Sequence, residues 1–157
     1  MEVVKITEEQ MELLSNSIRS IVKIYSFKRE VKAIYMIASN KGLNSYIDPP
    51  EQKGINIAIG IIDDGSIIKE HLVEVEAIKT QISNDIGINL FVERTPSDYF
   101  NQSMITSWEK NAGTMLANAT ILFDRTGNYK LLQKNLKKNS KKYQDVLIFD
   151  PPLQMTK

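Results

Sequence analysis

The side chains that most often carry out chemistry in proteins are scarce in this sequence. There is no cysteine, which excludes disulfides, thiolate catalysis and cysteine-ligated zinc. The single histidine, His71, excludes a metal site built on two histidines and leaves one candidate imidazole for a general base. His71 lies in a predicted helix among the glutamates of residues 70–76, so we interpret it as a surface residue.

A polar segment that follows a predicted strand offers a site for phosphate. Ser39, Asn40 and Lys41 come directly after the apolar run Val31–Ala38 (VKAIYMIA). A helix that began at Ser39 would point its free backbone N–H groups at an anion, and this would require no metal. The same residues are equally typical of an ordinary turn between a strand and a helix.

Lysines gather on the polar face of the last predicted helix, with few acids between them: Lys130, Lys134, Lys137, Lys138, Lys141 and Lys142. A basic helix of this kind can follow the phosphate backbone of a nucleic acid. The net charge of the whole chain is only +1, which instead favours a solvated face balanced by acids elsewhere.

The hydrophobic pattern predicts one domain over residues 1–157, with a helix over 7–26 and a core over 31–124. Thr7 and Gln10 form a capping box that begins the first helix. We predict strands over Val31–Ala38, Gly54–Asp63, Ile88–Glu93 and Ala119–Phe123.

Three more helices connect and follow these strands in the prediction. One is capped by Ser66 and ends at Gly87, and another is capped by Ser97 and carries Phe100 in the core. A basic C-terminal helix covers 128–144, after the turn Asp124–Gly127. In the tail over 145–157, the apolar segment 146–149 either adds a strand or covers a partner surface, and we expect it to pack on its own domain.

The sequence pattern predicts neither a signal peptide nor a membrane-spanning segment. Its N-terminus lacks the basic and apolar regions of a signal peptide, and the longest apolar run, Ile55–Ile62, is interrupted by Asn56. That run is far shorter than a bilayer span. We therefore expect a cytoplasmic protein with no membrane partner.

The order helix, strand, loop, strand, helix, strand, helix, strand, helix resembles the minimal nucleotidyltransferases of the DNA polymerase β superfamily. The resemblance covers about 31–136, and Ile121–Asp124 is its most faithful stretch. It implies an α/β (α+β) fold with a mixed sheet of about four to five strands flanked by helices. In that family two carboxylates on the second strand and one on the third hold Mg²⁺ against a nucleoside triphosphate.

The residues at the matching positions depart from the family's pattern. The Gly-Ser pair that ends the family's first strand falls on Ala38 and Ser39. The paired carboxylates fall on Gly54 and Asn56, and the third carboxylate falls on Asn89. Asparagine is neutral, and phosphoryl transfer depends on charge that positions metal and phosphate. The resemblance therefore implies a catalytically degenerate member.

Two hypotheses follow about the site itself. In the first, the chain is an inactive binding module that takes a nucleoside triphosphate, a nucleic acid or a protein, and its nucleotide site consists of Ser39, Asn40, Lys41, Asn56 and Asn89, with no cofactor. In the second, it is an active Mg²⁺-dependent nucleotidyltransferase whose acids are displaced to Asp48 and Glu93. Asp63 lies seven residues beyond Asn56, roughly 23 Å along an extended strand, and is too far to serve the same site.

A third hypothesis comes from another class of protein. Small bacterial members of the family pair with an all-helical partner, for instance in toxin–antitoxin couples. The resemblance therefore also implies an antitoxin-like interaction partner of a small helical protein. A homodimer is a further possibility at this stage.

Overall fold

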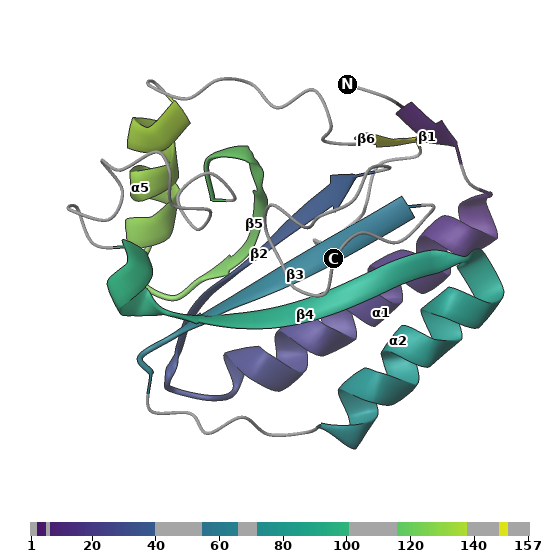
Figure 1. Cartoon of the computed structure of the whole chain (residues 1–157), viewed down its shortest axis with the longest axis horizontal. Helices are drawn as coiled ribbons and strands as arrows, with labels where there is room; N and C mark the ends of the chain where they lie inside the picture. Colours follow the sequence, from purple (N-terminus) through teal and green to yellow (C-terminus); the bar gives the residue numbers. More distant parts are fainter. Residues whose placement is uncertain are drawn as a thin grey trace.

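The computed structural model describes residues 3–5, 7–39, 55–65, 72–100, 116–137 and 148–150. Its centre is a four-stranded mixed sheet in the order β4-β3-β2-β5 (Figure 1). The strands are β2 (Val31–Ser39), β3 (Ile55–Asp63), β4 (Ile88–Pro96) and β5 (Thr120–Asp124). β2 runs antiparallel to both β3 and β5, whereas β3 and β4 are parallel. The predicted mixed α/β sheet is confirmed.

Helix α1 (Glu8–Ser26) begins as the sequence predicts. The Thr7 side chain accepts a hydrogen bond from the Gln10 backbone N–H at 3.1 Å, and the Gln10 side chain accepts one from the Thr7 N–H at 3.0 Å. These two bonds satisfy backbone donors that would otherwise lack partners at the start of a helix. The stripe of apolar residues that follows is buried against the sheet.

Helix α2 (Val73–Ile86) connects the parallel strands β3 and β4. It ends at Gly87, whose φ of 76° lies in the left-handed region that glycine adopts at little cost, as predicted. The predicted cap Ser66 and the histidine His71 lie outside the described residues. The described helix starts after Leu72, which takes the N-cap position in an extended conformation without a side-chain hydrogen bond.

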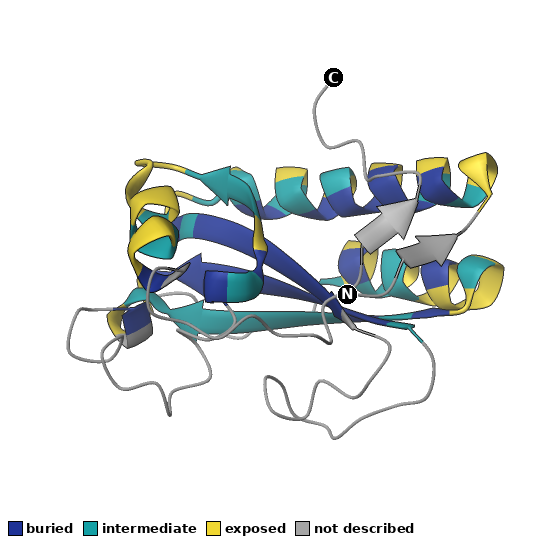
Figure 2. Ribbon diagram, turned by 90° about the horizontal axis from the view of Figure 1, so that it is seen from above, coloured by how far each residue is buried: buried dark blue, intermediate teal, exposed yellow. Residues whose placement is uncertain are grey.

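The sheet separates two apolar cores. On one face, α1 and α2 lie side by side and pack against alternate residues of β3, namely Ile57, Ile59 and Ile61 (Figure 1). On the other face, Ala58 and Ile62 of the same strand pack with Phe100 and with residues of the C-terminal half. β3 is therefore buried on both faces, and the inner strands of the sheet are largely dark blue in Figure 2.

The second face is covered by short elements. Among them are the 3₁₀ turn η1 (Ser97–Phe100) and helix α5 (Asn128–Lys137), whose Leu136 is buried. The predicted helix from Ser97 is described only as η1, since 101–115 lie outside the described residues. The part of the predicted basic helix beyond Lys137 lies outside them too. The turn before α5 is as predicted, with the Gly127 N–H donating to Asp124 Oδ1 at 3.1 Å.

Two three-residue strands form a separate sheet. β1 (Val3–Lys5) runs parallel to β6 (Ile148–Asp150), with Val3 paired to Ile148. The predicted tail thus adds a strand, but its partner is β1, which the sequence pattern did not predict. None of the described helices combines the length and apolar character that a bilayer span needs.

Candidate functional site

Three positions from the sequence analysis lie next to one another across the sheet. Ser39 of β2 is paired in register with Asn56 of β3, and Asn56 is paired with Asn89 of β4. We call these three residues the polar row. Within it, Asn89 Nδ2 donates a hydrogen bond to Asn56 Oδ1 at 3.1 Å.

The side chains of Asn56 and Asn89 lie on the sheet face that points away from α1 and α2. Asn56 alternates with Ile57, which packs against the helices, and shares its face with Ala58 in the second core. Only 1% of Asn56 is exposed to solvent, although its side chain is polar. A buried amide is costly without hydrogen-bond partners, and Asn89 supplies one of them.

Of the other predicted site residues, Glu93 alone belongs to the described part of the chain. Gly54, Asn40, Lys41 and Asp48 lie outside the described residues. Glu93 is in register with Gly60 and stands four residues beyond Asn89, roughly 13 Å along the strand. A carboxylate at that distance does not share a metal ion with the polar row, and the choice of Glu93 as a displaced ligand stays a prediction.

Asp63 has a structural role at the opposite end of β3. Its Oδ2 lies 3.3 Å from Arg94 Nε, and its Oδ1 accepts a hydrogen bond from the Gly65 N–H at 2.8 Å. The two side chains of this ion pair are 5% and 16% exposed, for Asp63 and Arg94 respectively. The pair therefore holds β4 to the end of β3, and Asp63 stands apart from the polar row, as expected.

A buried tyrosine covers the middle of the same sheet face. Tyr35 is 1% exposed and is paired in register with Gly60, and a Cβ atom on Gly60 would lie only 2.1 Å from Tyr35 Cζ. Burial raises the pKa of Tyr35 well above its usual value; the negative charge of Glu93 raises it further, and a hydrogen bond with the Thr95 side chain opposes both.

Sequence reasoning missed this tyrosine, although a signal was present. A single glycine inside a strand often marks a close approach by another group, and Gly60 interrupts an otherwise apolar strand. The sequence does not say which side chain fills the space above it.

An aromatic series continues from Tyr35 to α5. The ring of Phe100 packs edge-on against Tyr35 with centroids 6.4 Å apart, and against Tyr129 at 6.1 Å. Burial raises the pKa of Tyr129, and the nearby carboxylates of Asp124 and Asp98 add to the effect. Phe100 is 5% exposed, which confirms the prediction that it belongs to the core.

The described side chains of the polar row are poor ligands for a metal ion. Both of its described side chains are neutral amides, whereas Mg²⁺ prefers anionic oxygens. In the described ranges, no three histidine, aspartate or glutamate side chains gather as metal ligands would.

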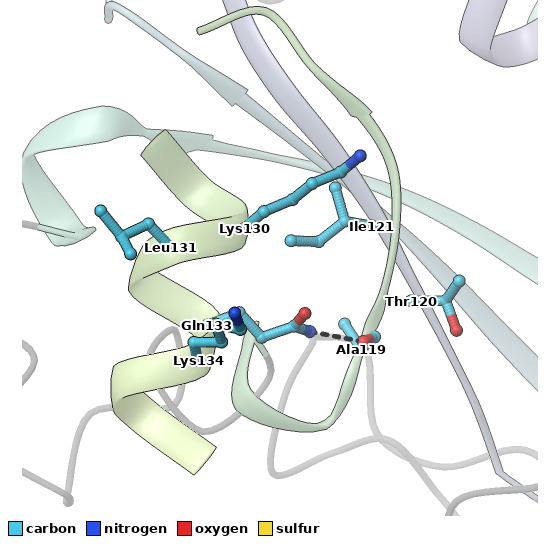
Figure 3. Close-up of a pocket in the computed structure, with 7 residues that line it drawn as sticks. All are labelled: Ala119, Thr120, Ile121, Lys130, Leu131, Gln133 and Lys134. Atoms are coloured by element: carbon cyan, nitrogen blue, oxygen red, sulfur yellow. Dashed lines mark hydrogen bonds between the residues drawn. The ribbon is translucent and has the colours of Figure 1, made fainter. Parts of the chain in front are cut away.

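A pocket opens elsewhere, between the edge strand β5 and α5 (Figure 3). Its volume is about 680 Å³, and Thr120, Ile121, Lys130, Leu131 and Lys134 are among the residues that line it. Lys130 and Lys134 are exposed and are the part of the predicted lysine face whose side chains are described. Since β5 and β3 lie on opposite sides of β2, this pocket is separate from the Asn56–Asn89 pair.

Comparison with known proteins bears on the fold. No protein-family model matches the chain, and no curated protein does either. Among solved structures, the chain is similar to a nucleotidyltransferase-like protein from Exiguobacterium sibiricum 255-15, with a TM-score of 0.53 and 14% sequence identity. The match covers 79% of this chain but only 38% of that one. The chain therefore has a nucleotidyltransferase-like α/β fold, with a mixed four-stranded sheet and flanking helices.

Proposed function

We propose that this chain is a nucleotidyltransferase-like protein without transferase activity, which binds a nucleoside triphosphate at the polar row without a metal ion. The observation that carries the proposal is the hydrogen bond from Asn89 Nδ2 to Asn56 Oδ1, which joins a buried and a half-buried side chain, both neutral.

The chemistry of this pair argues against catalysis. Two carboxylates on adjacent strands, about 4.8 Å apart, would repel each other unless a cation lay between them. Two amides instead attract each other, because one donates a hydrogen bond that the other accepts. The pair is stable without a metal and supplies none of the negative charge that holds metal ions for phosphoryl transfer.

The register of the sheet supports the alignment on which this reading depends. Ser39, Asn56 and Asn89 were matched to the family's site from sequence pattern, and they are far apart along the chain. All three fall in one row across three strands. An arbitrary choice of three strand residues would seldom share both a row and two adjacent pairings.

Asparagine also changes what the site can bind directly. A carboxylate repels a phosphate and needs a metal bridge, whereas an amide N–H donates a hydrogen bond to phosphate or ribose oxygens. The end of β2 lies beside this pair, and Asn40 and Lys41 follow it in the sequence. In the proposal, Lys41 supplies positive charge and backbone N–H groups after Ser39 bind the phosphates.

The first test is a thermal-shift titration with ATP, GTP, CTP and UTP, each in EDTA and in Mg²⁺. A ligand present at a hundred times its dissociation constant stabilises the folded state by about 2.7 kcal/mol, which is a shift of a few degrees. We expect at least one nucleotide to give this shift in EDTA. Release of pyrophosphate in Mg²⁺ would instead establish an active enzyme. If none of the four nucleotides shifts the melting temperature, the proposal of nucleotide binding is overturned.

Matched variants locate the site. Asn56→Asp and Asn89→Asp each put a negative charge beside the bound phosphates, so we expect both to abolish the shift in EDTA. Asn135→Asp makes the same change at an exposed position of α5 and serves as the control. If all three variants bind like the wild type, the nucleotide binds somewhere other than the polar row.

A protein partner remains a separate prediction. Co-purification with a small helical protein would support the antitoxin-like hypothesis. Mg²⁺-dependent turnover of a nucleoside triphosphate would instead support Asp48 as a metal ligand.

A further inference from the structure

We propose that the pocket between β5 and α5 binds an extended acidic segment of a partner protein, which adds to the sheet as a strand beside β5. The proposal goes beyond nucleotide binding and does not depend on it, because β5 and α5 line the pocket whereas the Asn56–Asn89 pair lies on β3 and β4.

The backbone feature on which this pairing depends is the outer edge of β5. In the described part of the chain, β5 pairs with β2 along one edge and with no strand along the other. Alternate residues of an edge strand point their N–H and C=O groups outward, where a further strand can bind them. Recognition by strand addition uses these main-chain groups for affinity and neighbouring side chains for specificity.

The walls of the pocket are held in place and are partly apolar. The Gln133 side chain donates hydrogen bonds to the carbonyls of Leu116 at 2.8 Å and Ala119 at 2.6 Å, which ties α5 to the segment that leads into β5 (Figure 3). Leu131 is 61% exposed at the pocket, and Ile121 of β5 lines it as well. An apolar side chain of an added strand can cover these two.

The charge of the lining selects among possible occupants. Lys130 and Lys134 stand one turn apart on α5, both exposed, and none of the described residues that line the pocket carries a carboxylate. An acidic strand complements them. A second copy of this chain would place two α5 helices on one face of a continuous sheet, with their lysines together, and like charges oppose that pairing. Nucleic acid would use the lysines but neither Leu131 nor the strand edge.

The test measures binding of labelled synthetic peptides to the whole chain by fluorescence anisotropy at low salt. The main probe is a short peptide that alternates valine and glutamate. Its controls are a valine–lysine peptide, a valine–glutamate peptide interrupted by prolines that cannot pair, and single-stranded oligo-dT. We expect binding of the first probe alone, together with slower hydrogen exchange of the β5 amides.

Variants assign the binding to this pocket. The double variant Lys130→Glu/Lys134→Glu should weaken binding roughly ten-fold, by two exposed charge pairs of typical strength. The control Lys23→Glu/Arg29→Glu reverses two exposed charges at the end of α1 and should leave affinity unchanged. Likewise Leu131→Ala should weaken binding, whereas Phe27→Ala, at another exposed apolar residue, should not.

Several results would overturn the proposal. These are equal binding of the prolyl peptide, no protection of the β5 amides, tighter lysine-dependent binding of oligo-dT, or a dimer that is lost in Leu131→Ala. If the valine–glutamate peptide does not bind the wild-type chain, the proposal fails without recourse to any variant.

Discussion

Replacing Gly60 with alanine tests how Tyr35 packs on the middle of the sheet. An added Cβ atom would lie 2.1, 2.4 and 2.6 Å from Cζ, Cε1 and Cε2 of the tyrosine ring. All three distances are far below van der Waals contact, so the ring must move. The backbone itself can accept alanine, because Gly60 is not among the glycines with positive φ.

The expected cost follows from what holds the ring. Tyr35 is 1% exposed, packs against Phe100 and is hydrogen-bonded to Thr95, so any displacement disturbs both contacts. Overpacking of a core costs about 1–3 kcal/mol, and loss of a buried hydrogen bond adds roughly 1 kcal/mol. We expect Gly60→Ala to lower the free energy of unfolding by about 2–4 kcal/mol.

Urea denaturation followed by circular dichroism measures this change, and a double-mutant cycle identifies its cause. In a Tyr35→Val background the space above Gly60 is open, so the same alanine should cost close to nothing. Gly87→Ala is the control: its Cβ would meet no atom within 4 Å but φ is 76°, so it should cost about 1 kcal/mol in both backgrounds. An equal cost of Gly60→Ala in both backgrounds would refute the steric reasoning.

Three further predictions concern other buried groups. Burial raises the pKa of Tyr35, so the folded chain keeps a proton that the unfolded chain releases above about pH 10. The free energy of unfolding should therefore fall above that pH, by up to about 1.4 kcal/mol per pH unit. Urea titrations at several pH values measure this fall, which should be smaller in Tyr35→Phe. Asp63→Asn should lower the free energy of unfolding by about 3 kcal/mol in urea denaturation, because it removes the carboxylate that lies 3.3 Å from the largely buried Arg94. A cost no larger than that of a surface change would contradict this. Arg125→Lys should lower stability by about 2 kcal/mol, because Arg125 donates to the backbone carbonyls of Ser26, Lys28 and Val31 between α1 and β2 and lysine cannot reach them all. Hydrogen exchange of the amides in this connection should become faster, and unchanged exchange would count against the prediction.

Elements with local signals were predictable from the sequence. The capping box at Thr7 and the left-handed position of Gly87 are set by interactions within a few residues, so both helix ends were found in advance. The polar row was reached by resemblance, since a row depends on strand register and periodicity alone does not give register.

Strands whose pairing partners lie far away in the sequence were either not predicted or predicted too short. β4 was predicted to end at Glu93 but continues to Pro96, because β3 offers paired residues as far as Asp63. Arg94 therefore belongs to the strand, although a charged residue there suggests a strand end. β1 could not be predicted, since three residues carry no periodic signal and their partner lies near the other end of the sequence.

That partner has a consequence for the order in which a growing chain can assemble. During synthesis, residues 3–5 leave the ribosome long before residues 148–150 exist, so β1 must wait unpaired while the four-stranded sheet forms. Joining segments so far apart is entropically costly in a loose chain and becomes cheap once the intervening domain has folded. The β1–β6 pair therefore forms late, after the four-stranded sheet has folded. A chaperone or partner protein that bound the nascent chain would find β1 accessible.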